Sequence, residues 1–253
     1  MTLKLDKNLK IVETKFGKIV VNINDEYIGK SFLFKNYWAE DEIMGISKVL
    51  ELKCKDKETI IFYDIGANIG SHSLALSQIF KNRIFIRAFE AQNIIYKMFE
   101  HTIEINKIKN IEIYNNAVSN KNNETIRIEL PDYSKFNNFG AFELYKPFKN
   151  STNISIKRNG IYEDVKTIKL DNFDEEVDLI KMDIEGMEDV AIEGARNIIK
   201  KFRPILYIEL LKTNNKEIIN YFKSNNYKIY LTSNNAFLVP NESRINFTGL
   251  KTI

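Results

Sequence analysis

The segment Asp64-Ile-Gly-Ala-Asn-Ile-Gly70 constrains the fold of this chain more than any other feature. It follows the apolar run 59–63 directly and precedes a helix-like segment at 71–80. Two glycines between a strand and a helix allow a tight turn, because glycine adopts positive φ angles without a steric penalty. Such a turn places a helix N-terminus, with its free N–H groups, beside a bound ligand. The segment therefore predicts a strand–loop–helix unit with a cofactor site at the loop.

The acidic residue that opens this loop indicates the charge of the ligand. The pattern D-x-G-x-N-x-G differs from G-x-G-x-x-G, the pattern of dinucleotide-binding loops. Asp64 at the strand end would repel a pyrophosphate, but it suits a cation. S-adenosylmethionine carries a positive sulfonium and a positive ammonium group, so we expect this cofactor. An NAD-dependent dehydrogenase on a similar fold is the alternative that the pattern disfavours.

Length and composition fit a single α/β domain. The chain has 253 residues, is 44% hydrophobic and contains 17 Phe, which supports a substantial core. A net charge of +3 without a long basic run disfavours a nucleic-acid partner. The single cysteine, Cys54, indicates a reducing compartment. The N-terminus lacks an apolar leader and no apolar run approaches ~20 residues, so we expect a cytoplasmic protein without a membrane span.

Strands and helices alternate from residue 59 onward. We expect strands at 59–64, 83–90, 111–118, 177–183 and 204–209, and helices at 70–80, 93–107, 187–199 and 214–224. Repeated β-α-β units imply a mostly parallel sheet with helices on both faces. A closing hairpin at 227–231 and 236–239 adds antiparallel strands. This combination favours the Rossmann-like class I methyltransferase fold, with seven strands, over the all-parallel dinucleotide fold.

Two parts of the chain lie outside this alternation. Residues 1–58 are expected to cap the sheet without forming an independent domain, so the methyltransferase domain would span 59–253. The polar, aromatic segment 131–160 is expected to be a substrate loop inserted over the cofactor cleft. Its aromatic and Asn side chains suit a sugar, and three lysines suit a phosphate on the substrate: Lys135, Lys146 and Lys149.

Acidic residues close four of the five expected parallel strands, where ligands of doubly wound sheets bind. Glu90 is expected to accept hydrogen bonds from the ribose diol of the cofactor, and Asp64 to contact its methionine part. Further cofactor contacts are expected from Gly66, Ala67, Asn68, Gly70, Ala91, Asn116, Ala117 and Asp183.

Six segments together resemble the FkbM family of methyltransferases. They are Asp64–Gly70, Ala88–Glu90, Asn116–Ser119, Lys166–Asp171, Asp178–Glu188 and Arg203–Glu209. The stretch Asp-Ile-Glu-Gly-x-Glu at 183–188 is the most specific of them, whereas the glycine loop alone marks only the wider class. The resemblance covers roughly residues 59–210. It implies S-adenosylmethionine-dependent O-methylation, often of sugar hydroxyls in glycoconjugates or natural products.

The chain departs from the family pattern at three positions. Ser71-His72 stands where the family usually has Tyr or Phe after the last glycine, and Ala91 stands where Pro usually follows the acid. Leu210 follows Glu209 where the family often has His. This chain therefore lacks a histidine at the end of its fifth parallel strand.

Three carboxylates are candidates for the chemistry. A neutral alcohol must lose its proton to attack a methyl group, so a base or a metal ion is expected. Asp183 and Glu209 end neighbouring strands, and Glu185 follows in the turn, so the three carboxylates should repel each other or recruit a cation. We expect Asp183 and Glu209 to hold a divalent ion (Mg, Mn, Ca or Fe), with Glu185 assisting. A metal-free reaction with one carboxylate as general base remains an open alternative.

The remaining candidates are less constrained by the sequence. His72 is a candidate base or metal ligand, or a polar wall of the site, and Glu188 is expected to favour a helix start. The segment Asn137–Ala141 resembles a recurrent segment of the family, so Asn138 and Phe139 are expected near the acceptor. Trp38 would supply the opposite wall, or ordinary core packing.

The sequence thus favours an S-adenosylmethionine-dependent O-methyltransferase that acts on a sugar hydroxyl, for example of a nucleotide-activated sugar in surface-polysaccharide synthesis. Alternatives are methylation of another small molecule or of RNA, and a non-catalytic binding module. A homodimer is compatible with the sequence.

Overall fold

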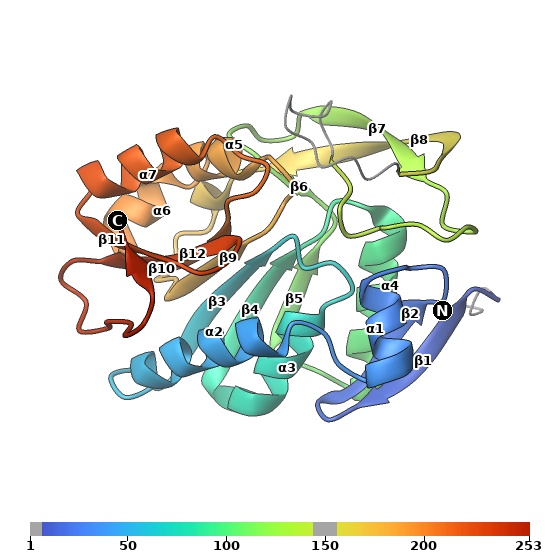
Figure 1. Ribbon diagram of the computed structural model, residues 1–253, viewed down its shortest axis with the longest axis horizontal. Coiled ribbons are helices and arrows are strands. Elements are labelled where there is room, and N and C mark those ends of the chain that lie inside the picture. The colour runs from blue at the N-terminus through green and yellow to red at the C-terminus, as the bar shows by residue number, and fades with distance from the viewer. Residues whose placement is uncertain (1–6, 144–155) are drawn as a thin grey trace.

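The computed structural model describes residues 7–143 and 156–253. Its centre is a mixed sheet of eight strands in the order β13-β11-β12-β10-β9-β3-β4-β5 (Figure 1). The parallel strands are β5 (Ile111–Tyr114), β4 (Ile84–Phe89), β3 (Ile60–Ile65), β9 (Leu179–Met182) and β10 (Ile205–Glu209). The antiparallel strands are β12 (Asn235–Pro240), β11 (Tyr227–Leu231) and the two-residue edge strand β13 (Lys251–Thr252). The predicted seven strands and the terminal hairpin are present, and β13 is added at the edge.

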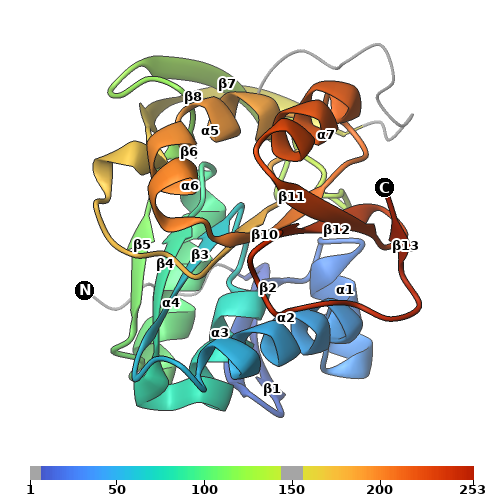
Figure 2. The same ribbon diagram turned by 90° about the vertical axis from the view of Figure 1, so that its left-hand side faces the viewer.

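Helices cover both faces of this sheet, as Figure 2 shows. One face carries α5 (Glu188–Glu193), α6 (Arg196–Phe202) and α7 (Asn215–Ser224), and the other carries α2 (Glu40–Lys53), α3 (Ser71–Phe80) and α4 (Asn93–Asn106). Successive side chains of a strand point to opposite faces, so Tyr63 and Ile65 pack under the first group and Phe62 under the second. Among the helices of the described residues, none is long and apolar enough to cross a membrane.

The predicted strand 111–118 ends early. β5 stops at Tyr114, and Ala117–Val118 form a separate strand, β6, in a small sheet with β7 (Thr125–Pro131) and β8 (Arg158–Ile168). The side-chain amide of Asn115 donates hydrogen bonds of 2.9 Å to the carbonyls of Glu90 and Ala91. The chain therefore leaves the central sheet beside Glu90.

The predicted helix 187–199 is two helices, α5 and α6, separated at Gly194-Ala195. A Cβ atom on Gly194 would lie 2.0 Å from the carbonyl oxygen of Ser119. Only glycine permits this close approach, so packing against the neighbouring loop interrupts the helix.

The N-terminal segment packs beside the sheet. It contains β1 (Leu9–Thr14), β2 (Gly17–Asn22) and α1 (Ile28–Lys35). The amide of Val20 in β2 donates to the hydroxyl of Thr102 in α4 at 3.0 Å. A β-bridge joins Asp25 to Asn137, so the N-terminal segment and the segment after β7 lie side by side near the strand ends (Figure 1).

Candidate active site

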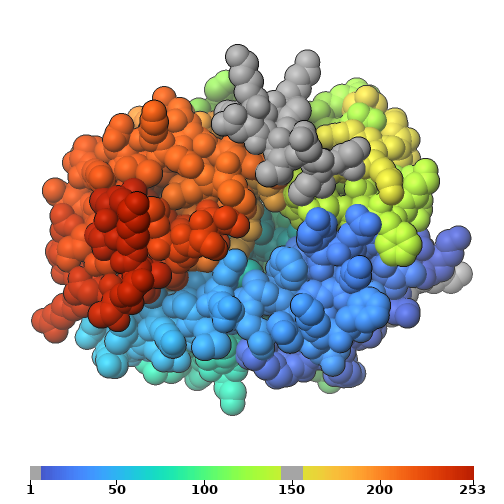
Figure 3. Space-filling model, in the orientation of Figure 1, coloured from blue at the N-terminus to red at the C-terminus, as the bar shows by residue number. Residues whose placement is uncertain are grey.

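A cavity of about 280 Å³ lies where β3, β4, β9 and β10 end. Figure 3 shows the molecular surface hollowed between the blue N-terminal segment and the orange C-terminal half. Most of the predicted site residues line this cavity: Trp38, Gly66, Ala67, Asn68, His72, Glu90, Ala91, Asn116, Ala117, Asn138, Asp183, Glu185 and Glu209. Asp64, Gly70 and Phe139 are not among the lining residues.

The two glycines of the cofactor loop are required by packing within the protein. Gly66 has a φ of +75°, and a Cβ atom there would lie 1.9 Å from the carbonyl oxygen of Asp183. Gly70 has a φ of +85°, and a Cβ atom there would lie 2.2 Å from the ring of Phe99. The positive φ angles agree with the tight turn expected from the sequence, and neighbouring protein atoms in addition occupy the space of both missing side chains.

The amides of the same loop are bonded inside the protein. Gly66 and Ala67 both donate to the carbonyl oxygen of Phe89 at 3.0 Å. The amides of Asn68 and Gln92 donate to the carboxyl group of Glu90 at 3.0 and 2.8 Å. The amides of Gly66, Ala67 and Asn68 therefore do not face a ligand, whereas the prediction for the first turn of α3 stays a prediction. Burial raises the pKa of Glu90 to about 7 despite these two hydrogen bonds.

Asp64 is fully buried beneath the loop and pairs with a lysine that the sequence analysis did not single out. Its Oδ1 atom lies 3.2 Å from Nζ of Lys181, and its Oδ2 accepts a 2.7 Å hydrogen bond from Ser73. Burial is the largest influence and opposes the ionisation of Asp64, but the interactions with Lys181, His72 and Ser73 together outweigh it and hold the pKa of Asp64 below its ordinary value. The predicted contact of Asp64 with the cofactor is not supported by this position.

A sequence signal for Lys181 did exist. The lysine stands inside the apolar strand 177–183, two residues before Asp183, and therefore shares its face of the sheet. A lysine is rarely buried without a partner, and parallel pairing places Asp64 directly opposite.

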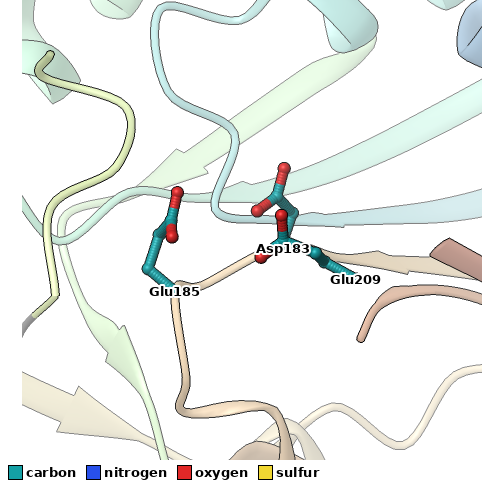
Figure 4. Close-up of side chains that lie close together, drawn as sticks. All are labelled: Asp183, Glu185 and Glu209. Atoms are coloured by element: carbon teal, nitrogen blue, oxygen red, sulfur yellow. The ribbon is translucent and has the colours of Figure 1, made fainter. Parts of the chain in front are cut away.

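The carboxyl groups of Asp183, Glu185 and Glu209 form a cluster at the cavity, with oxygen atoms within 4.8 Å of one another. Figure 4 shows the three side chains rising together above the ends of β9 and β10. Burial, and then the charge of Asp183, raise the pKa of Glu209 to about 9 and that of Glu185 to about 7. The buried Oε2 atom of Glu209 has no hydrogen-bond partner within 7–143 and 156–253. The predicted cluster therefore exists, and its oxygen donors fit a hard divalent cation.

Lys212, which was not predicted as a site residue, pairs with Glu185 of this cluster. Its ammonium group forms an ion pair with Glu185 and lies 3.5 Å from Glu143. It also donates to the carbonyl oxygen of Ala141 at 3.4 Å. Glu185 has a φ of +56°, an unfavourable conformation for a residue with a side chain. Lys212 thus fixes Glu185 and joins it to the segment that follows β7.

Glu188 positions the turn that carries the cluster. The sequence interpretation made it a helix-start carboxylate, and it is indeed the first residue of α5. Its Oε1 accepts the amide of Ile184 at 2.9 Å, and its Oε2 accepts the amide of Gly186 at 3.1 Å. Both amides flank Glu185, so Glu188 fixes the backbone from which this carboxylate projects.

We expect Glu188→Ala to lower the free energy of unfolding by about 1–3 kcal/mol, because two amides lose their buried acceptor. Turnover should fall by up to about 100-fold if the turn shifts by ~1 Å. Asp189→Ala is the matched control, since Asp189 lies in the same helical turn but, among the described residues, accepts a hydrogen bond only from the amide of Val190. Urea unfolding and steady-state kinetics of both variants test this, and equal losses in the two variants would contradict the assigned role.

His72 faces another residue that the sequence did not single out. Its Nε2 atom lies 3.4 Å from Oε2 of Glu42, which belongs to α2 and also lines the cavity. The side-chain amide of Asn235 donates a hydrogen bond to Oε1 of Glu42 at 3.4 Å. Burial opposes ionisation of Glu42, but its hydrogen bond and charge interaction with His72 lower its pKa overall. No pattern in the sequence connects these three distant residues.

The predicted substrate residues separate into two groups. Asn138 and Trp38 line the cavity, whereas Phe139 is fully buried with its ring 4.8 Å from that of Tyr133. The place of Phe139 supports core packing rather than contact with an acceptor. Lys135 is exposed and pairs with Asp132 at 3.0 Å. The other two predicted phosphate ligands, Lys146 and Lys149, lie outside the described residues.

The fold and the site together define a Rossmann-like class I methyltransferase, with the loop after β3 and acids at the ends of the neighbouring strands. The model of the methyltransferase FkbM domain matches residues 64–229. The chain therefore belongs to the FkbM methyltransferase family, which confirms the prediction from the sequence. Membership implies S-adenosylmethionine as the methyl donor. Comparison with curated proteins gives no match.

Several solved structures are similar to this chain. The methyltransferase FkbM of Methylobacillus flagellatus KT is 19% identical with a TM-score of 0.49, over 72% of this chain and 44% of that one. The tRNA (uracil-54, C5)-methyltransferase of Pyrococcus abyssi, in complex with S-adenosyl-L-homocysteine, is 11% identical with a TM-score of 0.47, over 92% and 45%. Monomeric WbdD is 10% identical with a TM-score of 0.46, over 84% and 44%. The chain spans less than half the length of each of these three proteins.

Proposed function

We propose that this chain transfers the methyl group of S-adenosylmethionine to a hydroxyl group of a sugar. One observation carries this proposal: three carboxyl groups, of Asp183, Glu185 and Glu209, converge at the cavity beside the cofactor loop. Such a cluster is suited to removing or weakening the proton of a neutral hydroxyl. Methyl transfer to an alcohol requires this step.

The cavity wall favours a sugar as the acceptor. Aromatic and amide side chains are among the residues that line it, namely Tyr27, Trp38, Asn138, Asn234 and Asn235. Aromatic faces stack on the apolar faces of sugar rings, and amides donate to and accept from hydroxyls. A nucleotide-activated sugar of surface-polysaccharide synthesis is the specific acceptor class that we propose, in the cytoplasm.

Asp183 and Glu209 would act directly on the acceptor oxygen. The unpartnered Oε2 of Glu209 and the nearby Asp183 carboxylate can hold a divalent ion, whereas Glu185 is already paired with Lys212. A bound Mg²⁺ or Mn²⁺ would lower the pKa of a coordinated hydroxyl. Glu185 and Lys212 would then orient the sugar beside the methyl group.

The test is a screen of nucleotide-activated and free sugars with radiolabelled S-adenosylmethionine, with and without a chelator. We expect methyl incorporation into a sugar, and turnover that falls at least about tenfold after dialysis against EDTA and returns with Mg²⁺ or Mn²⁺. Full turnover in the presence of EDTA would contradict the proposed metal ion. One of the carboxylates would then be the general base. Methylation of RNA or of an amine, with no sugar accepted, would overturn the proposed acceptor.

Glu90 gives a pH dependence to cofactor binding. Its pKa of about 7 in the free protein means that it carries a proton below pH 7. A ribose diol donates best to the ionised carboxylate, so binding requires loss of this proton. We expect the Kd of S-adenosylhomocysteine to rise as pH falls below 7, by at most about tenfold per pH unit.

Calorimetry between pH 5.5 and 8.5 on the wild type and Glu90→Gln measures this effect. The variant should bind more weakly at pH 8 and show a flat profile. An unchanged slope in Glu90→Gln would assign the proton to another group.

A further inference from the structure

Lys181 is a buried cation in the wall of a cavity that we propose binds a positively charged cofactor. It has no role in the proposed deprotonation of the acceptor hydroxyl. Its side chain is 3% exposed, yet it is one of the cavity-lining residues. A lysine in the middle of a central strand is unfavourable unless it is paired. Lys181 neutralises the buried charge of Asp64, which explains why the two residues pair. It does not explain why Lys181 also lines the cavity.

The contacts of the ammonium group leave part of it available. Nζ lies 3.2 Å from Oδ1 of Asp64 and donates to the carbonyl oxygen of Gly66 at 3.3 Å. An ammonium group has three N–H donors. Within the described parts of the chain no further acceptor is in hydrogen-bond contact with Nζ, so one donor is free for a ligand in the cavity.

The charges around Lys181 match a zwitterion. Asp64, its partner, does not line the cavity, whereas the carboxylates of Glu42 and Asp183 do. Of the carboxylates that line the wall, those of Glu42 and Asp183 act electrostatically on the buried ammonium group of Lys181. The methionine part of S-adenosylmethionine carries one carboxylate and one ammonium group, so the complementary charges are present on both sides.

We propose that Lys181 binds the carboxylate of the cofactor's methionine part. This inference rests on the proposed function, because it takes S-adenosylmethionine as the ligand. Asp64 holds Lys181 in place and is itself a positioning residue, while the ammonium group of the cofactor meets Glu42 and Asp183. The hydrogen bond from Lys181 to Gly66 then sets the distance between the methionine end and the glycine loop.

Calorimetry with three ligands tests this assignment. They are S-adenosylhomocysteine, its decarboxylated analogue, and 5′-methylthioadenosine, which lacks the whole amino-acid part. The wild type should prefer S-adenosylhomocysteine over the decarboxylated analogue by about 10- to 100-fold, the range for a charge-assisted hydrogen bond. Lys181→Met should bind these two ligands equally and bind 5′-methylthioadenosine as the wild type does. A preference that persists in Lys181→Met would overturn the assignment.

A second variant covers the case in which Lys181→Met fails to fold. The double variant Asp64→Asn/Lys181→Met removes both buried charges, and it should also lose the preference while binding 5′-methylthioadenosine normally. Asp64→Asn alone keeps Lys181 but weakens its positioning, so the preference should fall below that of the wild type without vanishing. Wild-type protein that binds S-adenosylhomocysteine without any preference would overturn only this inference. Wild-type protein that binds none of the three ligands would overturn the proposed function as well.

Discussion

The variant Glu209→Gln is expected to lose roughly 10²- to 10⁴-fold in turnover, the range for removal of an acid–base group, without loss of stability. Glu209 lies in a cluster with Asp183 and Glu185, and one of its carboxyl oxygens is buried without a hydrogen-bond partner in the part of the chain that the structure describes. Its pKa is raised to about 9, so the folded protein holds a proton there that the unfolded chain releases above the ordinary Glu pKa. Stability therefore falls as pH rises from about 4.5 to 9. Glutamine keeps the shape and removes this dependence.

Thermal unfolding at pH 6, 7 and 8, combined with kinetics, separates the two effects. The midpoint of Glu209→Gln should exceed that of the wild type at all three pH values, by a difference that grows from pH 6 to pH 8. Glu217→Gln is a control on α7, because Glu217 is exposed and is not among the residues that line the cavity. Joint loss of stability and turnover would mean that Glu209 holds the fold together rather than serving the reaction.

The variant Gly66→Ala is expected to lose cofactor binding and at least about 3 kcal/mol of stability. Gly66 has a φ of +75°, and its new methyl group would lie 1.9 Å from the carbonyl oxygen of Asp183. The oxygen belongs to the backbone, so relief requires movement of the turn that carries the carboxylate cluster. In a chain of this size such a loss lowers the melting temperature by roughly 6–12 °C.

Gly160→Ala is a closely matched control. Gly160 has a φ of +73°, but its Cβ atom would meet nothing within 4 Å. At Gly160 the substitution costs only the strain of a positive φ angle, which lowers the free energy of unfolding by about 1–2 kcal/mol. Denaturant unfolding of both variants and titration with S-adenosylhomocysteine measure the difference. Equal losses would show that backbone conformation alone, without the contact to Asp183, accounts for the glycine.

The central sheet could be predicted from the sequence because its strands are short apolar runs between amphipathic helices. The runs of β3, β9 and β10 are buried on both faces, so the alternation of strand and helix is visible without knowledge of the partners. The break after Tyr114 was not visible, because the amide of Asn115 causes it by bonding to Glu90 and Ala91. The interruption at Gly194 was hidden for the same reason, since it depends on contact with Ser119.

For the acidic residues of the cavity, too, some features could be predicted from the sequence and others depended on tertiary contacts. The positions of Asp183 and Glu209 followed from topology, because parallel neighbouring strands end at one edge of the sheet. The pairing of Asp64 with Lys181, of Glu185 with Lys212, and of His72 with Glu42 depends on side-chain directions in three dimensions. A count of strand-end acids does not distinguish a neutralised carboxylate from one that is free to act.

The sequence by itself determined the class of this protein: a methyltransferase of the FkbM family, with a glycine loop and acids at the strand ends. Those features are local, since each depends on a few consecutive residues and on strand order. Only the tertiary structure decided which acids face the cavity and which are neutralised. It placed Asp64 under the loop, left an oxygen of Glu209 without a partner, and brought Lys181 to the wall. Burial and the distance between charges set these states, and both exist only in the folded chain.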